Sequence, residues 1–130
     1  MSKQDSPKKP TEAELNILGV IWDRNRATVR EVHDTLRARS DIGYTTVLKL
    51  MQIMTEKGLL QRDTDVRPQV YRATRPRRQT QRMLLRQLVD RAFSGSPGSL
   101  VLQALDLRKS TPEELEQIRA RLDELEDDGR

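Results

Sequence analysis

Apolar residues in the first half of the chain recur at spacings of three and four, which is the period of a helix with one buried face. The pattern predicts three consecutive helices, of which the first follows Thr11, the second follows Thr28 and the third covers residues 43–58. Their predicted core positions are Leu15, Leu18, Ile21 and Trp22 in the first helix, Val29, Val32 and Leu36 in the second, and Val47, Leu50, Met51 and Met54 in the third.

Three helix starts share the pattern Thr-x-x-Glu. In this capping box, the Thr hydroxyl and the Glu carboxylate accept hydrogen bonds from backbone N–H groups that have no partner inside the helix. The pairs are Thr11 with Glu14, Thr28 with Glu31, and Thr111 with Glu114. The last start is strengthened by Pro112 at the first helical position.

After Gly58 the period changes, and residues 59–74 are typical of two short strands around a polar tip at 63–68. Pro68 lacks the N–H that a central strand needs, so it fits the tip or an edge. Three helices followed by a hairpin are the order of a winged helix-turn-helix. The predicted fold is therefore mainly α, with a β-hairpin wing and a helical region after it.

Helical spacing returns beyond the hairpin over residues 75–94 and 100–107, with a Gly- and Ser-rich break at 94–99, and again after Thr111. These last three helices are marginal for burying a core alone. Their apolar faces would meet across a two-fold axis, the commonest arrangement of homo-oligomers; the alternative is that they fold back on the first domain. The predicted dimer interface is Leu85, Leu88, Val89, Leu102, Leu105, Leu115, Ile118, Leu122 and Leu125.

Composition narrows the choice of class. Aromatic residues are only 3% of the chain, so the core must be aliphatic, and cysteine is absent, which removes disulfides and thiolate chemistry. No apolar run approaches the ~20 residues of a membrane-spanning helix, and the N-terminus MSKQDSPKKP lacks the apolar stretch of a secretion signal. We expect a cytoplasmic protein without membrane insertion.

Charge is unevenly distributed along the chain. Residues 1–58 hold ten Lys or Arg against eight Asp or Glu, residues 59–95 hold nine Arg against three acids, and residues 96–130 hold five basic residues against nine acids. A basic middle segment suggests a polyanionic partner. Solubility alone is the simpler alternative, and charge by itself does not exclude it.

Groups that could perform catalysis are scarce. His33 is the single histidine, and an exposed or phosphate-contacting role is the simpler interpretation. The acids gather in the last helix, as on a solvated face or an interaction tail. Gly95 and Gly98 follow no strand, so they do not form a phosphate-binding loop. We predict no enzymatic activity, no cofactor and no metal site.

The third helix carries an unusual polar face, which we call the polar stripe: Tyr44, Thr45, Thr46, Lys49 and Gln52. A solvated helix face is normally rich in Glu and Lys pairs, whereas this stripe contains no carboxylate. Hydroxyl, amide and ammonium groups can contact base edges in the major groove, where the last helix of a helix-turn-helix lies. The stripe therefore predicts binding to double-stranded DNA.

Arg62, Arg67 and Arg72 in the hairpin would supply phosphate contacts that do not depend on sequence. Each feature has an alternative: Thr45 or Thr46 could cap the helix, Lys49 and Gln52 could line a solvated face, and the arginines could be plain surface charge. The ordered set favours DNA. We assign residues 1–9 to a disordered tail, 10–75 to a winged-helix DNA-binding domain and 76–127 to a helical dimerisation domain.

The sequence resembles the penicillinase-repressor family of winged-helix transcriptional regulators (BlaI/MecI/CopY) from Pro10 to about Glu126. The matching segments are TEAELNILGVIWDR, TVREVHDTLRAR, GYTTVLKLMQIMTEKGLL, GSLVLQAL and TPEELEQIRARL. The resemblance implies a homodimeric repressor of palindromic operator DNA. It implies base contacts at Thr45, Thr46, Lys49 and Gln52, and backbone contacts at Tyr44 and Arg67.

The resemblance also bears on release from DNA. β-Lactam-responsive members are cleaved at an Asn-Phe bond after SLVL under the control of a membrane protease, which would make such a protease a partner. The corresponding candidate cleavage position here is Gln103-Ala104, which lacks that recognition pair, and the cysteines of copper-responsive members are absent. The alternative function is a non-enzymatic protein-interaction module that uses a winged-helix scaffold and an acidic C-terminal helix.

Overall fold

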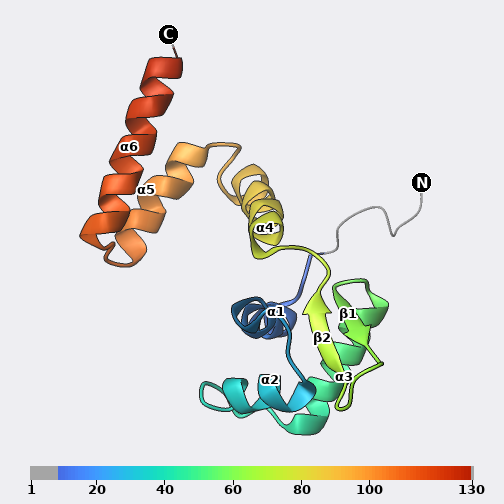
Figure 1. The fold of residues 1–130 in the computed structure, drawn as a ribbon. Helices are drawn as coiled ribbons and strands as arrows, with labels where there is room; N and C mark the ends of the chain where they lie inside the picture. Colours follow the sequence, from blue (N-terminus) through green and yellow to red (C-terminus); the bar gives the residue numbers. More distant parts are fainter. Residues whose placement is uncertain (1–8, 130) are drawn as a thin grey trace, which may run out of the picture. The chain divides into compact units, whose positions relative to one another are not determined.

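The computed structural model describes residues 9–129 of the chain (Figure 1). This part is mainly helical and contains a two-stranded antiparallel sheet, so the predicted winged helix followed by further helices is confirmed. The elements are α1 Glu12–Arg24, α2 Val29–Leu36, α3 Tyr44–Glu56, β1 Leu60–Asp63, β2 Val70–Ala73, α4 Arg77–Ala92, α5 Pro97–Leu107 and α6 Pro112–Asp128.

The three predicted capping boxes are present at the starts of α1, α2 and α6. In each, the Thr Oγ1 accepts a hydrogen bond from the Glu backbone N–H, at 3.2 Å for Thr11, 3.1 Å for Thr28 and 3.0 Å for Thr111. A short local pattern therefore fixes where these helices begin, because both partners lie within one turn.

The core of the winged-helix unit lies where α1, α2 and α3 pack against each other and against the hairpin. It is built from Ile17, Leu18, Val20, Ile21, Ala27, Val29, Val32, Leu36, Val47, Met51, Met54, Leu59, Leu60 and Tyr71. Three predicted core residues, Leu15, Trp22 and Leu50, are only half-buried. Trp22 and Leu50 pack at the edge of this core.

The wing is a hairpin in which β1 pairs with β2 in antiparallel register. A single residue of the α1–α2 connection extends it, because Ala27 and Tyr71 exchange both backbone hydrogen bonds, at 3.0 and 2.8 Å. The connection before α2 is thus fixed to the wing, although the two are more than forty residues apart in the chain.

Polar contacts on α1 hold two other elements in place. The Glu14 carboxylate is buried and accepts a hydrogen bond from Lys57 Nζ at 2.8 Å, just beyond the end of α3. On another side of α1, Trp22 Nε1 donates to the Arg75 carbonyl at 3.0 Å. Arg77 at the start of α4 pairs with Asp23, and its guanidinium lies 5.6 Å from the centre of the Trp22 ring.

The chain divides into two compact units between Leu85 and Arg86, within α4. In the second unit, α5 and α6 contain no buried residue. Of the predicted disordered tail, residues 1–8 lie outside the described residues and Lys9 is exposed. The predicted domain boundary after residue 75 stays a prediction. None of the described helices is both long and apolar enough to cross a membrane.

The predicted break at 94–99 is wrong in its second half. α5 begins at Pro97, because Pro suits the first helical position and Ser96 caps the helix by accepting a hydrogen bond from Ser99 N–H at 3.1 Å. The chain reverses at Ser94 and Gly95, which have positive φ angles. α4 is correspondingly shorter than the predicted 75–94 and ends at Ala92.

Candidate nucleic-acid interface

Every residue of the polar stripe is exposed on α3. The opposite side of the same helix is fully buried at Val47, Met51 and Met54. The domain core therefore holds α3 by one face and presents the other outward, which is the orientation required of a helix that enters a major groove.

The start of α3 differs from the starts of α1, α2 and α6 because no side chain caps it. Its N-cap residue is Gly43, and neither Thr45 nor Thr46 occupies that position. The interpretation of these threonines as helix caps is therefore wrong. The first backbone N–H groups of a helix have no partner within it, and together with the helix dipole they favour an anion such as a phosphate.

Tyr44 is held at this helix start by two residues of α2. The Arg30 guanidinium lies 5.4 Å from the centre of the Tyr44 ring, and the His33 ring meets it edge-on at 5.8 Å and 83°. His33 Nδ1 is buried and has no hydrogen-bond partner among the described residues. His33 is half-buried, so the exposed role expected from the sequence is wrong, and its observed contact is the packing against Tyr44. Within residues 9–129, no group of three potential ligands lies together that could hold a metal ion.

The three hairpin arginines do not form one surface. The register places Arg62 opposite Tyr71 and Gln61 opposite Arg72. Residues directly opposite each other share a face of the sheet and successive residues alternate, so Arg62 and Arg72 lie on opposite faces. All three arginines, with Arg67 in the loop between the strands, are nevertheless exposed.

Arg67 instead joins a basic hollow between the wing and the α1–α2 connection, with a volume of about 520 Å³. Sequence reasoning missed two arginines of this hollow, Arg24 and Arg26. They reach the wing through the pairing of Ala27 with Tyr71, which no local pattern in the sequence predicts. The hollow is lined by Arg24, Arg26, Thr28, Glu31, Val66, Arg67, Pro68 and Val70.

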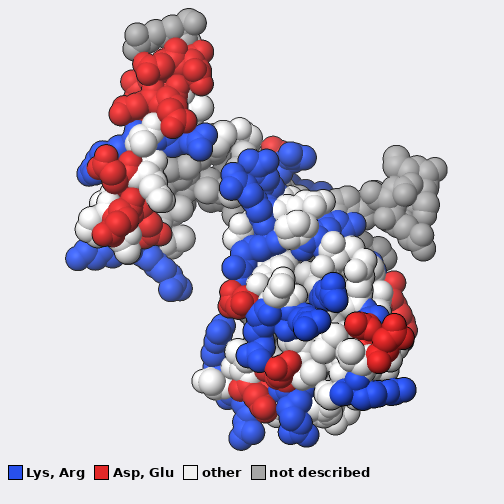
Figure 2. Space-filling view, viewed as in Figure 1, with Lys and Arg blue, Asp and Glu red and all other residues white. Residues whose placement is uncertain are grey.

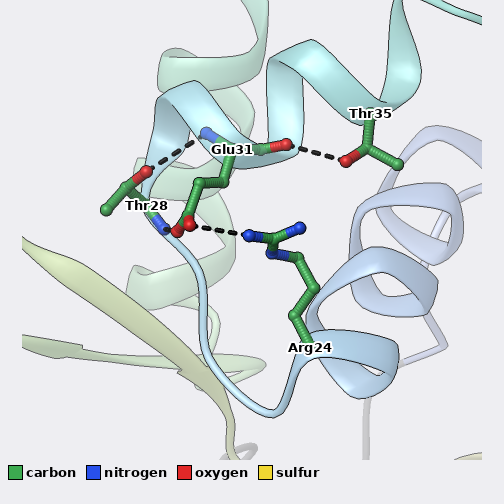
Figure 3. A network of polar contacts seen from close by, with 4 residues as sticks. All are labelled: Arg24, Thr28, Glu31 and Thr35. Atoms are coloured by element: carbon green, nitrogen blue, oxygen red, sulfur yellow. Dashed lines mark hydrogen bonds and ion pairs between the residues drawn. The ribbon is translucent and has the colours of Figure 1, made fainter.

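A polar network orders one side of this hollow (Figure 3). Glu31 accepts hydrogen bonds from Thr28 N–H at 2.9 Å and from Arg24 Nη2 at 2.7 Å. The bond from Thr28 and then the one from Arg24 lower the pKa of Glu31, so its carboxylate is charged at neutral pH and neutralises Arg24. Arg26 and Arg67 make no ion pair within residues 9–129, which leaves their charge available to a phosphate.

Figure 2 shows basic side chains over the winged-helix unit and α4, and acidic side chains gathered at the C-terminal end of α6.

The predicted dimer-interface residues are accessible to solvent in the single chain. Five of them are exposed, at 49% for Leu85, 48% for Leu88, 68% for Leu102, 50% for Leu122 and 57% for Leu125. The other four are half-buried: Val89, Leu105, Leu115 and Ile118. Sequence reasoning missed the exposed Val101 and Leu107. Gln103 and Ala104 are exposed on α5.

A three-helix domain with a hairpin wing, which presents an uncapped polar helix outward, defines a winged helix-turn-helix protein. The model of the penicillinase repressor family matches residues 10–124, and the chain belongs to this family. Its members are transcriptional repressors, and this membership confirms the expectation that the protein is not an enzyme.

Similar curated proteins carry the description "Transcriptional regulator BlaI" and come from two strains of Mycobacterium tuberculosis, CDC 1551 / Oshkosh and ATCC 25618 / H37Rv. Each is 36% identical to the chain over 61 residues, which are 46% of this chain and 44% of the relative. The chain thus spans less than half the length of the curated relatives that it matches.

Proposed function

We propose that the protein is a homodimeric repressor that binds palindromic operator DNA through α3. The observation that carries this proposal is the polar stripe, which is exposed, free of carboxylates and continuous with an uncapped helix start. A carboxylate at these positions would repel the DNA backbone, and a side-chain cap would occupy the N–H groups that a phosphate can use.

Each residue of the stripe has a role in this proposal. Thr45 and Thr46 offer hydroxyl groups and a methyl contact for thymine, Gln52 suits adenine, and Lys49 suits guanine. Tyr44 and Arg67 contact the backbone. To these we add Arg26, since it faces the same hollow as Arg67. Backbone contacts position the protein, whereas base contacts choose the sequence.

Dimerisation would come from the apolar faces of the second unit. Since α5 and α6 bury no residue within one chain, a second copy supplies the missing cover. Two-fold symmetry would place two α3 helices in major grooves about one helical turn, or a multiple of it, apart, and the operator would be palindromic for the same reason. The bound dimer would then obstruct polymerase sterically.

A second proposal concerns release of the repressor from DNA by proteolysis. The Gln103-Ala104 bond lies inside α5, so a membrane-controlled protease that takes an extended substrate would require this helix to open first. The protease would also have to recognise a Gln-Ala bond, which differs from the Asn-Phe bond that is cleaved in β-lactam-responsive members of the family.

A gel-shift series in salt tests DNA binding. If the dimer neutralises ~8 phosphates, log affinity should fall against log salt with a slope of about −7. A slope near zero would contradict the proposal. The rival, a protein-interaction module that uses the acidic end of α6, predicts that the polar stripe does not sense nucleic acid and that removal of this end abolishes capture of a basic partner.

A further inference from the structure

α4 carries five arginines and one acid, Asp90. Three of the arginines, which we call the arginine row, are Arg78, Arg82 and Arg86. Residues four apart lie on one side of a helix, so the row runs along α4 over about 12 Å at 1.5 Å per residue. All three side chains are exposed.

Local stability does not explain the arginine row. Like charges four residues apart destabilise a helix, and basic groups in the first turn oppose the helix dipole, yet the first turn of α4 contains no acid. Arg77 has a structural partner in Asp23. No ion pair within the described residues involves Arg78, Arg82 or Arg86. A row of charge that weakens its own helix points to a partner outside the chain.

Within the winged-helix unit, the start of α4 and the helix α3 lie on different sides of α1 (Figure 1). α1 buries Ile17 and Ile21 in the core that it shares with α3, and its outer side binds α4 through Gly19 and Asp23. The polar stripe faces away from that core. A duplex bound to the stripe would therefore leave Arg78 and Arg82, the two members of the arginine row in this unit, uncovered.

We propose that the arginine row is a second DNA-binding face, which takes the backbone of a second duplex while α3 holds the operator. Guanidinium groups pair with phosphates through two parallel hydrogen bonds. The arginine row contains only guanidinium groups, and these fit the regularly spaced phosphates of a duplex and binding that does not depend on sequence. The protein would then bridge two DNA segments. This inference rests on the proposed function, because it assumes that α3 holds the first duplex.

Bridging can be measured with the full chain. Protein is loaded on a bead-bound duplex of mixed sequence, and capture of a second, fluorescent duplex is followed in a salt series. The triple variant Arg78→Gln, Arg82→Gln, Arg86→Gln should load normally but lose second-duplex capture, with the salt slope of capture smaller by about 3 per chain. A matched control, Arg108→Gln, Arg119→Gln, Arg121→Gln, removes the same charge from exposed positions outside α4 and should capture like the wild type.

Capture by the triple variant at the level of the control would overturn the inference. The inference would also be overturned if the triple variant captured the second duplex like the wild type and differed only in a lower sedimentation coefficient. That result would mean that the arginine row binds the acidic surface of a second copy of the chain. If the triple variant does not fold by circular dichroism, the single variants Arg82→Glu and Arg86→Glu decide in the same assay.

A polar-stripe variant separates this inference from the proposed function. Lys49→Glu with Gln52→Glu should lose sequence preference yet keep weak, salt-dependent DNA binding, which the arginine-row substitutions then remove. If it selects and binds duplexes like the wild type, the proposed function fails, whatever the arginine row does.

Discussion

Lys49 carries the only basic group on α3, and its side chain is exposed between threonine and glutamine positions of the polar stripe. We expect Lys49→Ala to weaken operator binding by ~1–3 kcal/mol and to relax preference at one operator position. Fluorescence anisotropy with duplexes changed at single positions measures both effects. Lys109→Ala, at an exposed residue between α5 and α6, is the control and should bind like the wild type. An equal loss on specific and random DNA would instead make Lys49 a phosphate contact.

Glu14 links the stability of the winged-helix unit to pH. Burial tends to raise its pKa, but hydrogen bonds from Lys57 and Thr11 outweigh burial, and the pKa lies below the ordinary 4.5. A carboxylate with a lowered folded-state pKa stabilises the fold above the unfolded pKa and loses this contribution as pH falls through the folded value. The contribution is therefore complete above about pH 5 and declines below 4.5.

Glu14→Gln should lower the free energy of unfolding by ~1–3 kcal/mol near neutral pH, because it removes one partner of a buried ion pair. The loss should shrink as pH falls below 4.5 and through the lowered folded-state pKa of Glu14, because the wild-type carboxylate then becomes neutral as well. Urea denaturation near neutral pH and below pH 4.5 measures this change in the free energy of unfolding, with Glu113→Gln at an exposed position as the control. An equal loss at both values would show that the carboxylate charge is not responsible.

Some residues of the candidate interface could be found in the sequence and others could not. The polar stripe and the capping boxes depend on residues within one or two helical turns, so periodicity was sufficient to locate them. Arg24 and Arg26 lie beside the wing, in the hollow that Arg67 also lines, only because Ala27 pairs with Tyr71. The opposite directions of Arg62 and Arg72 depend on strand register. These features arise from contacts between distant segments, which a local pattern does not contain.

At the scale of the element, the absence of a side-chain cap at the start of α3 lowers the stability of the helix but leaves its first N–H groups free to bind a phosphate. Gly43 has φ −82°, and a Cβ there would meet no atom within 4 Å. Gly43→Asp would cap the helix and add a few tenths of a kcal/mol of stability. It would also place a negative charge where a phosphate is expected, and DNA binding should weaken by ~1 kcal/mol or more.

Thermal melting and gel shift on the same Gly43→Asp protein should therefore change in opposite directions. Gly43→Asn caps without charge and serves as the matched variant, with a smaller loss of binding. Unchanged affinity in Gly43→Asp would mean that no phosphate lies at the α3 start.

Element boundaries show a second limit of sequence reasoning. The Gly- and Ser-rich segment before α5 was predicted as one continuous break, yet the helix begins at Pro97 with Ser96 as its cap. The same residue types that interrupt a helix also begin one. The positive φ of Ser94 and Gly95 decides where the interruption lies, and backbone angles follow from packing that composition does not specify.

At the scale of the whole molecule, the exposed apolar face of α6 predicts self-association. Leu122 is 50% exposed in the single chain, so a charge there should not disturb the monomer but should disrupt a dimer interface. Leu122→Asp is expected to sediment as a monomer and to lose ~10²-fold or more in operator affinity, because two linked sites bind with high effective concentration. Gln117→Asp, at an exposed residue of the same helix, is the control. An unchanged sedimentation coefficient in Leu122→Asp would contradict the dimer assignment.

Selection of duplexes from a random pool is the most direct test of whether the polar stripe reads DNA. The full chain should enrich palindromic duplexes whose half-sites are about one helical turn, or a multiple of it, apart. In parallel, Lys49→Ala should enrich a pool that has lost preference at one position in each half-site. Enrichment of no sequence by the wild type, or of the same sequences by both proteins, would contradict the role given to α3.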